Sequence, residues 1–461
     1  MNRWLAAVLL SLVPLSLLAQ ERKEEDRREK PDRQPKLQAI TLPAVGGSYV
    51  DPSTGNRIWR VSDRGLCTRG AKHYYSYWPV WNADGSHLLV ECQGWLGSRD
   101  SSTILLVRDK DLKVVGDALG SARSFNKGHL FWSWKDPQAF YAFRDSEVWK
   151  WNPFSGKGSR IASLDNLKVG ESSVRSIVLA YVSFDDRYLL LELQGPNLRR
   201  QKPNPHDTLG LLTYDMQAGK VAGLLDITTW RFYDEAVFTK DNHVWVRMTD
   251  DAGAPQSLRF SLDFSERNRV AEGGHHAHGI LPDGSPVAVK EASNRDCPPG
   301  SPSGNPNDKE YPAKGWKPTA VLLDPRVDTA GAERNAPIAS ILFKLGCQIK
   351  GQHEFSHFSW NNSQPDVFFG ETWSYGSAEG NPIADAIIRV RLKFDGGGKI
   401  SGDEIDVLAH HRSDKRHGYW ATPRVSCNQQ GTRCLFASAM SNGANDSDGG
   451  PNLYIVDVPK R

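Results

Sequence analysis

A pattern of short strands and tight turns recurs along most of this chain and limits the folds that it can adopt. Each copy has a strand with polar and aromatic residues, a turn that contains Asp, Asn or Gly, and then a short apolar strand. The copies lie at residues 79–90, 131–143, 180–193, 235–248, 276–289, 355–369 and 422–436. The residues that end the first strands are Trp81, Trp134, Phe184, Thr239, Leu281, Trp360 and Cys427. The repeat therefore has a period of roughly fifty residues, which is typical of stacked four-stranded units.

This repeat predicts an all-β protein, a seven-bladed β-propeller. A small sheet of this kind buries its two faces only against neighbouring sheets, so the copies are expected to form a ring. Third strands are expected at residues 104–107, 148–151, 209–214, 257–260, 320–323, 386–390 and 453–456.

The seventh copy lacks a fourth strand of its own, and residues 55–61 (GNRIWRV) offer one near the N-terminus. Pairing of this N-terminal strand with the C-terminal blade would close the ring and leave no free sheet edge. We therefore expect a single propeller domain over residues 42–461, with residues 293–317 as an inserted surface loop.

The first 41 residues differ in composition from the repeats. Residues 1–20 combine Arg3, an apolar run and a small residue, Ala19, which is typical of a cleaved secretory signal peptide. Residues 21–41 are mostly charged and predict a disordered leader. The mature protein is expected to be exported, either secreted or periplasmic, without a membrane span and as a monomer.

Six cysteines in an exported chain can all pair. Cys427 and Cys434 flank a predicted tight turn, and order in the sequence pairs Cys67 with Cys92 and Cys297 with Cys347. The alternative is that these cysteines are free buried thiols. A formal charge of +3 and the lack of a long basic stripe argue against a nucleic-acid partner.

Histidines concentrate in the fifth and sixth copies, at His275, His276, His278, His353 and His357. Alternation along a strand would place His276 with His278 on one face, and His353 with Phe355 and His357 on another. First strands line the channel of a propeller, so their polar ends would converge at one mouth. Neutral imidazoles suit Zn, Mn, Fe or Ni, with Gln352 or a carboxylate as an oxygen ligand. The alternative is that these histidines cap strands, hydrogen-bond between blades or contact substrate.

Arg416 and His417 precede the seventh first strand, where they could hold a ligand's carboxylate beside a base; the alternative is a solvated loop end. Residues 395–406 fit a β-turn better than a calcium loop, because Gly and Lys occupy positions that need oxygen ligands. Neither GxSxG nor a phosphate-binding glycine loop occurs, which disfavours an esterase or a nucleotide-binding enzyme.

The repeats with Asp-Gly turns and the exported N-terminus resemble the propeller of the periplasmic Tol-system protein and related WD-like bacterial repeats. A histidine-bearing strand before such a turn, followed by a Gln and His cluster, is also similar to oligogalacturonate lyases, which are seven-bladed propellers that hold a divalent metal, typically manganese. This resemblance implies His278, Gln352, His353 and His357 as metal ligands.

Two functions are consistent with these observations. The first is a metal-dependent lyase acting on an acidic oligosaccharide, in which metal and Arg416 neutralise the uronate carboxylate and His417 or His276 removes a proton. The second is a non-catalytic propeller that binds a glycan or a periplasmic protein. Propellers serve both roles, so the fold does not choose between them. No organic cofactor is expected.

Overall fold

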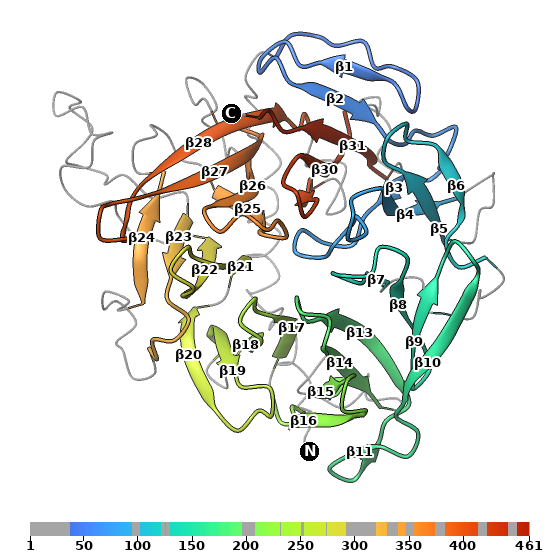
Figure 1. Ribbon diagram of the computed structural model, residues 1–461, viewed down its shortest axis with the longest axis vertical. Coiled ribbons are helices and arrows are strands. Elements are labelled where there is room, and N and C mark those ends of the chain that lie inside the picture. Colours follow the sequence, from blue (N-terminus) through green and yellow to red (C-terminus); the bar gives the residue numbers. More distant parts are fainter. Residues whose placement is uncertain are drawn as a thin grey trace, which may run out of the picture.

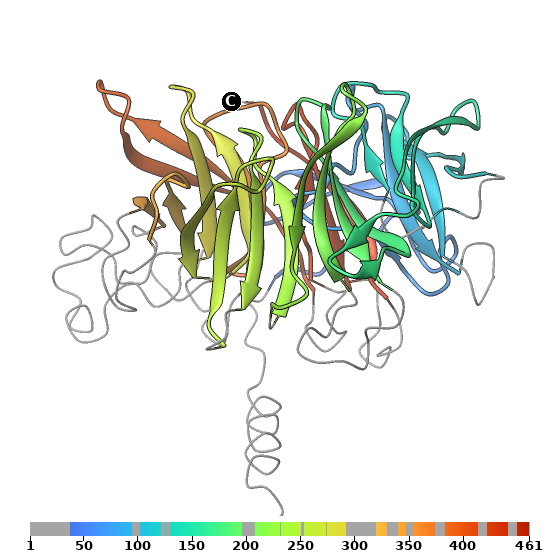
Figure 2. The same cartoon turned by 90° about the horizontal axis from the view of Figure 1, so that it is seen from below.

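We analysed a computed structural model of the chain, which describes residues 37–94, 102–120, 125, 130–195, 208–230, 232–249, 253–272, 274–291, 320–329, 340–346, 354–373, 383–413, 422–440 and 450–460. Within these ranges every regular element is a β-strand. The strands form a ring of small twisted sheets around a central axis (Figure 1), and the sheets stand side by side when the ring is viewed from its edge (Figure 2).

Seven antiparallel sheets make up the ring. In the first six, the strands follow one another in sequence order from the axis outwards. Blade one contains β3 (Ala71–Lys72), β4 (His87–Gln93), β5 (Ser102–Arg108) and β6 (Val114–Asp117), and blade two contains β7 (Phe131–Trp132), β8 (Phe140–Arg144), β9 (Glu147–Asn152) and β10 (Lys157–Ser163). Blade three contains β13 (Ser176–Val182), β14 (Tyr188–Gln194), β15 (Thr208–Asp215) and β16 (Lys220–Asp226), and blade four contains β17 (Phe232–Phe238), β18 (Val244–Thr249), β19 (Pro255–Phe260) and β20 (Arg267–Glu272).

Blade five contains β21 (His276–Ile280), β22 (Pro286–Glu291), β23 (Ala320–Leu323) and β24 (Ile341–Leu345), and blade six contains β25 (Glu354–Ser359), β26 (Val367–Trp373), β27 (Ala386–Phe394) and β28 (Ile400–His410). Blade seven joins β29 (Ser426–Cys427), β30 (Arg433–Ser438) and β31 (Asn452–Asp457) to β2 (Arg57–Arg60) and β1 (Ser48–Val50). A small hairpin, β11 (Lys168–Val169) with β12 (Ser172–Ser173), lies outside the blades.

The ring closes as the sequence predicts, through the N-terminal strand. β2 pairs with β31, with Ile58 opposite Val456 and Trp59 opposite Ile455, and Trp59 Nε1 donates to Asp457 Oδ2 at 2.9 Å. β1 adds a fifth strand outside β2. The outer edge of β31 is therefore covered by segments almost four hundred residues earlier in the chain.

The core lies between the blades, where the predicted first-strand anchors pack. Trp81, Trp360 and Cys427 are almost wholly buried. Trp360 lies so close to blade five that a Cβ on Gly279 would come within 2.5 Å of its ring, which explains the glycine at that position. Two of the three predicted disulfides are present, Cys67–Cys92 and Cys427–Cys434, whereas Cys297 and Cys347 lie outside the described residues.

Blade one departs from the repeat. Its first strand ends at Lys72, and residues 73–78, here called the axial segment, leave the sheet and contact all six other blades. Ring contacts join Trp78 to Phe131 of blade two and Tyr77 to His276 of blade five. Tyr77 O accepts a hydrogen bond from Tyr181 Oη of blade three, and Tyr77 Oη donates one to Glu235 of blade four. Ser76 O and Trp78 O accept hydrogen bonds from Asn361 Nδ2 of blade six, and Trp78 O also accepts one from Ser426 Oγ of blade seven. Only a segment at the axis can reach every blade, so this segment fills the middle of the channel.

Candidate functional site at the channel mouth

Blade five provides the first imidazole–carboxylate pair of the mouth. His275 directly precedes β21, and its Nδ1 lies 2.5 Å from Glu291 Oε1 at the end of β22. The two side chains are 28% and 32% exposed, so water and solutes can reach them. A carboxylate at Nδ1 fixes the ring and leaves Nε2 as the acceptor when the imidazole is neutral.

Blade six provides a second pair, which is buried. His357 Nδ1 lies 2.6 Å from Glu371 Oε1, and Glu371 Oε2 accepts a hydrogen bond from Val425 N at 3.0 Å. Burial holds the pKa of His357 well below its usual value and raises the pKa of Glu371 to about 7. His357 is therefore neutral, and its Nε2 has no hydrogen-bond partner among the described residues.

A β-bulge in β25 turns His357 towards the mouth. The pairing register with β26 shifts between Phe355 and His357, and Phe355 stacks on Phe358 in the core between blades five and six. The prediction that Phe355 and His357 share a face is therefore wrong, because the extra residue of a bulge breaks the two-residue alternation.

The two pairs meet over the axial segment. The rings of His275 and His357 are 4.3 Å apart, and the ring of Tyr75 lies 5.0 Å from His357 in a T-shaped arrangement. Arg424 Cζ lies 5.5 Å from the centre of the Tyr75 ring. The mouth thus combines two oriented imidazoles, a phenol and a guanidinium from blades one, five, six and seven.

His276 and His278 take a different position, between blades four and five. Their rings lie 5.1 Å and 4.7 Å from Trp245 of β18, and His276 also stacks on Tyr77 at 6.0 Å. They lie together, 4.9 Å apart, as alternation predicts. Burial lowers the pKa of both well below the usual value. In the described structure neither nitrogen of His278 has a hydrogen-bond partner.

Blade four, next to blade five, carries acidic groups, and its Glu235 Oε1 lies 3.8 Å from His276 Nδ1. Arg247 of β18 bonds Asp234 at 2.6 Å and Glu235 at 2.7 Å, and Glu235 also accepts a hydrogen bond from Tyr77. Nearby, Glu192 of β14 accepts a hydrogen bond from the hydroxyl of Tyr233, and burial raises the pKa of Glu192 to about 7. Arg247 is thus already engaged by two carboxylates.

The remaining predicted site residues, Gln352, His353, Arg416 and His417, lie outside the described residues. Among those described, no three His, Cys, Asp or Glu side chains group as a metal site. His357 alone of the described ligand candidates has the features of a metal ligand at the mouth, because Glu371 fixes its Nδ1 and leaves Nε2 available.

Sequence reasoning missed Glu291, Glu371 and Arg424, and named His275 only as part of a cluster. The sequence does contain a signal for Glu371, because the second strands of several blades have an ionisable residue at the equivalent position. These residues are Glu91, Glu192, Arg247, Lys290 and Glu371. Arg424 has no such repeat signal, because it lies before a short first strand.

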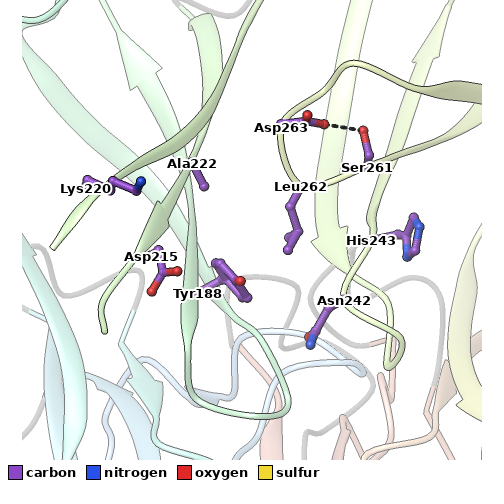
Figure 3. A pocket seen from close by; sticks show the side chains of 9 residues that line it. All are labelled: Tyr188, Asp215, Lys220, Ala222, Asn242, His243, Ser261, Leu262 and Asp263. Carbon is purple, nitrogen blue, oxygen red and sulfur yellow. Dashed lines mark hydrogen bonds between the residues drawn. The ribbon is translucent and has the colours of Figure 1, made fainter. Parts of the chain in front are cut away.

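A separate pocket of about 280 Å³ lies between blades three and four, away from the mouth (Figure 3). Tyr188, Asp215 and Lys220 line one side, and His243 and Asp263 lie on the other. It shares no residue with the two imidazole–carboxylate pairs, so we do not assign it to the same site.

No protein-family model matches the sequence, and no curated protein sequence matches it. Among solved structures, the chain is similar to an oligogalacturonate lyase from Vibrio parahaemolyticus, with a TM-score of 0.54 and 15% identity over 92% of this chain and 99% of that one. The β-propeller domain of the Trilobed protease from Pyrococcus furiosus gives a TM-score of 0.42 and 10% identity, over 84% of this chain and 95% of that one. The likeness to the Vibrio structure supports the propeller fold; the resemblance to the Tol-system protein stays a prediction.

In the part of the chain that the structure describes, no helix could span a membrane.

Proposed function

We propose that this protein is an exported lyase that cleaves uronate-containing oligosaccharides by β-elimination at the channel mouth. The observation that carries the proposal is the pair of imidazole–carboxylate groups, His275–Glu291 and His357–Glu371, with their imidazole rings 4.3 Å apart. The name of the similar Vibrio protein, an oligogalacturonate lyase, supports the same class of substrate.

The reaction needs a base that reaches the sugar. The base removes the proton at C5 of the uronate, the electron pair forms the C4–C5 double bond, and the C4–O bond breaks as the leaving oxygen takes up a proton. We propose His275 for this base, because Glu291 orients it and it is partly exposed. His276 and His417 are further candidates; the near-complete burial of His276 makes it harder for a sugar to reach.

A divalent ion belongs to the proposal, with Mn favoured by resemblance and Zn, Fe or Ni as alternatives. His357 would hold it through Nε2, and Gln352 and His353 are the other proposed ligands; His278, the fourth predicted ligand, lies instead against Trp245 between blades four and five. When bound, such an ion would draw electrons from the uronate carboxylate and so acidify the C5 proton. Arg416 would add positive charge at the same carboxylate.

Formation of unsaturated uronate from oligogalacturonate and other acidic glycans tests the proposal. We expect the wild-type protein to produce it, and His275→Ala to lower kcat/KM by about a hundredfold or more, as loss of a general base does. His87→Ala is a matched control, because His87 of β4 lies far from the mouth against Phe154. No product from any uronate glycan, with a folded protein, would contradict the lyase.

Metal content separates the lyase from a binding propeller. We expect stoichiometric divalent ion in the purified protein and its loss in His357→Ala, whereas His87→Ala retains it. Saturable glycan binding without product or bound metal would instead favour the non-catalytic propeller that binds a glycan or periplasmic protein.

A further inference from the structure

We propose that the pocket between blades three and four binds a neutral sugar residue (Figure 3). This pocket is separate from the channel mouth, so the proposal does not depend on the lyase activity. It stands on three observations: the walls of the pocket are held in place, the charges of its lining cancel, and exposed polar groups flank its apolar side chains.

The pocket lies towards the face of the propeller opposite the mouth. The second strand of blade three, β14, begins at the pocket with Tyr188, and β15 ends there with Asp215. At the mouth the order is reversed, because His275 precedes β21 and Glu291 ends the second strand β22. Equivalent strands of a propeller run in the same direction along the axis, so a ligand in the pocket cannot touch the base proposed at the mouth.

Interactions between the two blades hold the walls of the pocket in place. Asn242 Nδ2, in the turn before β18, donates to Asp185 Oδ2 of blade three at 2.9 Å, and Thr213 Oγ1 of β15 donates to Leu262 O. A Cβ on Gly223 would come within 2.6 Å of Leu262 O, so the two blades touch directly at this point. A ligand therefore meets a preformed site, and little conformational entropy is lost when it binds.

The charges of the lining cancel. Asp215 Oδ2 pairs with Arg187 Nη2 at 2.8 Å, and Lys220 and Asp263 add one charge of each sign. With an uncharged imidazole at His243, no net charge selects an anion or a cation. A neutral ligand with many hydroxyl groups fits this lining better than a uronate does, because Asp263 would repel the carboxylate of a uronate.

Exposed polar groups flank the apolar side chains of Ala222 and Leu262, which line the pocket from the two blades. Lys220 is exposed, and its ammonium has no partner among the described residues. Asp263 is also exposed, and the three hydrogen bonds from neighbouring serines all go to its Oδ1, which leaves Oδ2 for a ligand.

A pyranose matches this combination of groups. Its C–H groups can pack on apolar side chains, while its hydroxyls donate to a carboxylate and accept from an ammonium. The volume of about 280 Å³ is close to the lower end of the range of about 300–1,000 Å³ that is usual for small-molecule sites, which suits a single sugar ring.

Binding of neutral oligosaccharides tests the proposal. Saturation-transfer NMR of the full protein with oligosaccharides of glucose, galactose, mannose and arabinose identifies a neutral probe, and calorimetry then measures its Kd. We expect at least one of the four to bind, with a Kd on the order of 1 mM because the contact area is small. Trigalacturonate, an acidic sugar proposed for the mouth, should not displace it.

Substitutions locate the site. Ala222→Trp fills the pocket and should weaken binding of the neutral probe at least tenfold. Lys220→Met removes the exposed ammonium and should weaken binding by about three- to tenfold, and it keeps the proposal testable if Ala222→Trp does not fold. Val115→Trp is the matched control, because it adds the same ring at a 53% exposed position in the fourth strand of blade one. This control and His275→Ala should bind the probe like the wild type.

Failure of all four neutral oligosaccharides to bind, unchanged affinity in either folded pocket variant, or displacement of the probe by trigalacturonate would overturn the proposal. Retained binding of the neutral probe by a protein that cleaves no uronate glycan would contradict the lyase alone.

Discussion

The two imidazole–carboxylate pairs at the mouth differ in how far water reaches them. His275 and Glu291 are partly exposed, whereas His357 and Glu371 are almost fully buried. A group that exchanges protons with a sugar must be reachable, and a group that holds an ion or fixes a geometry gains from burial. We therefore assign proton transfer to His275 and a holding role to His357.

Glu291→Gln tests this assignment at the blade-five pair. The amide keeps the size of the side chain but removes the negative charge that fixes His275, so kcat should fall by about ten- to a hundredfold with little change in stability. Kinetics on a uronate oligosaccharide measure this effect, and Asp283→Asn in the exposed turn of blade five is the control. Wild-type kcat in Glu291→Gln would exclude the orienting role.

Glu192 predicts how stability depends on pH. Burial raises its pKa from 4.5 to about 7 in the folded protein, so the folded state binds this proton more tightly than the unfolded state does. Stability should therefore fall as the pH rises from about 4.5 to about 7, by an amount of order 1–3 kcal/mol from this group.

Urea denaturation across that pH range measures the slope. Glu192→Gln should reduce this slope, because the amide carries no titrating proton, but part of the slope should remain, because burial also raises the pKa of Glu371 to about 7. Glu266→Gln, at an exposed position, should leave it unchanged. A wild-type slope that persists in Glu192→Gln would show that other groups cause it.

Individual residues of the site were only partly predictable from the sequence. The histidines stand out because their type is rare and their spacing is short, but Glu371 and Glu291 look like ordinary strand residues until the neighbouring strand is placed. Arg424 has a left-handed backbone conformation. The sequence does not predict it, because Arg424 is neither a glycine nor an asparagine, the residues that usually adopt this conformation.

At the scale of elements, the axial segment determines the form of the mouth. Residues 73–78 leave blade one after a two-residue strand and carry Tyr75 and Tyr77 into the channel. Asn361 of blade six holds this segment, since its Nδ2 lies 3.3 Å from Ser76 O and 3.1 Å from Trp78 O. The segment that brings Tyr75 to the site therefore comes from blade one, whereas His275 and His357 come from blades five and six.

Asn361→Ala should loosen the axial segment. It removes a buried donor to two carbonyl groups, which should lower the free energy of unfolding by about 1–3 kcal/mol. Denaturation followed by tryptophan fluorescence measures the change. Asn268→Ala loses an exposed hydrogen bond to Arg326 O and should lower the free energy of unfolding only slightly. Equal decreases in the free energy of unfolding of both variants would argue against a special role for Asn361.

The repeat made the blades predictable, including the third strands and the closing strand, because each copy keeps its apolar alternation and its turn. It could not predict the axial segment or the bulge at Phe355 and His357, since both arise where the chain departs from the repeat to meet other blades. Those departures form the candidate site.

For the whole molecule, the N-terminal strand should be essential for a closed ring. A chain that begins at residue 62 lacks β2 and leaves the edge of β31 exposed, so we expect aggregation or a strongly lowered melting temperature. A chain that begins at residue 37 keeps every described strand and should behave like the full protein. Thermal melting with light scattering distinguishes them, and equal stability of the two would refute closure by β2.

The ring also explains how residues from four blades come together at one mouth. Tyr75, His275, His357 and Arg424 are separated by up to 349 positions in the sequence, yet neighbouring ring centres and charges lie within about 6 Å of one another. The candidate site is therefore a property of the assembled propeller rather than of any single blade.

The masses of the products formed from a uronate tetrasaccharide test the central claim most directly. Elimination adds no water, so we predict two products whose masses sum to that of the substrate, one of them with a C4–C5 double bond. Products that together exceed the substrate by one water would show hydrolysis, and an intact tetrasaccharide after incubation with folded protein would show that the mouth does not cleave it; either result would contradict the proposed lyase.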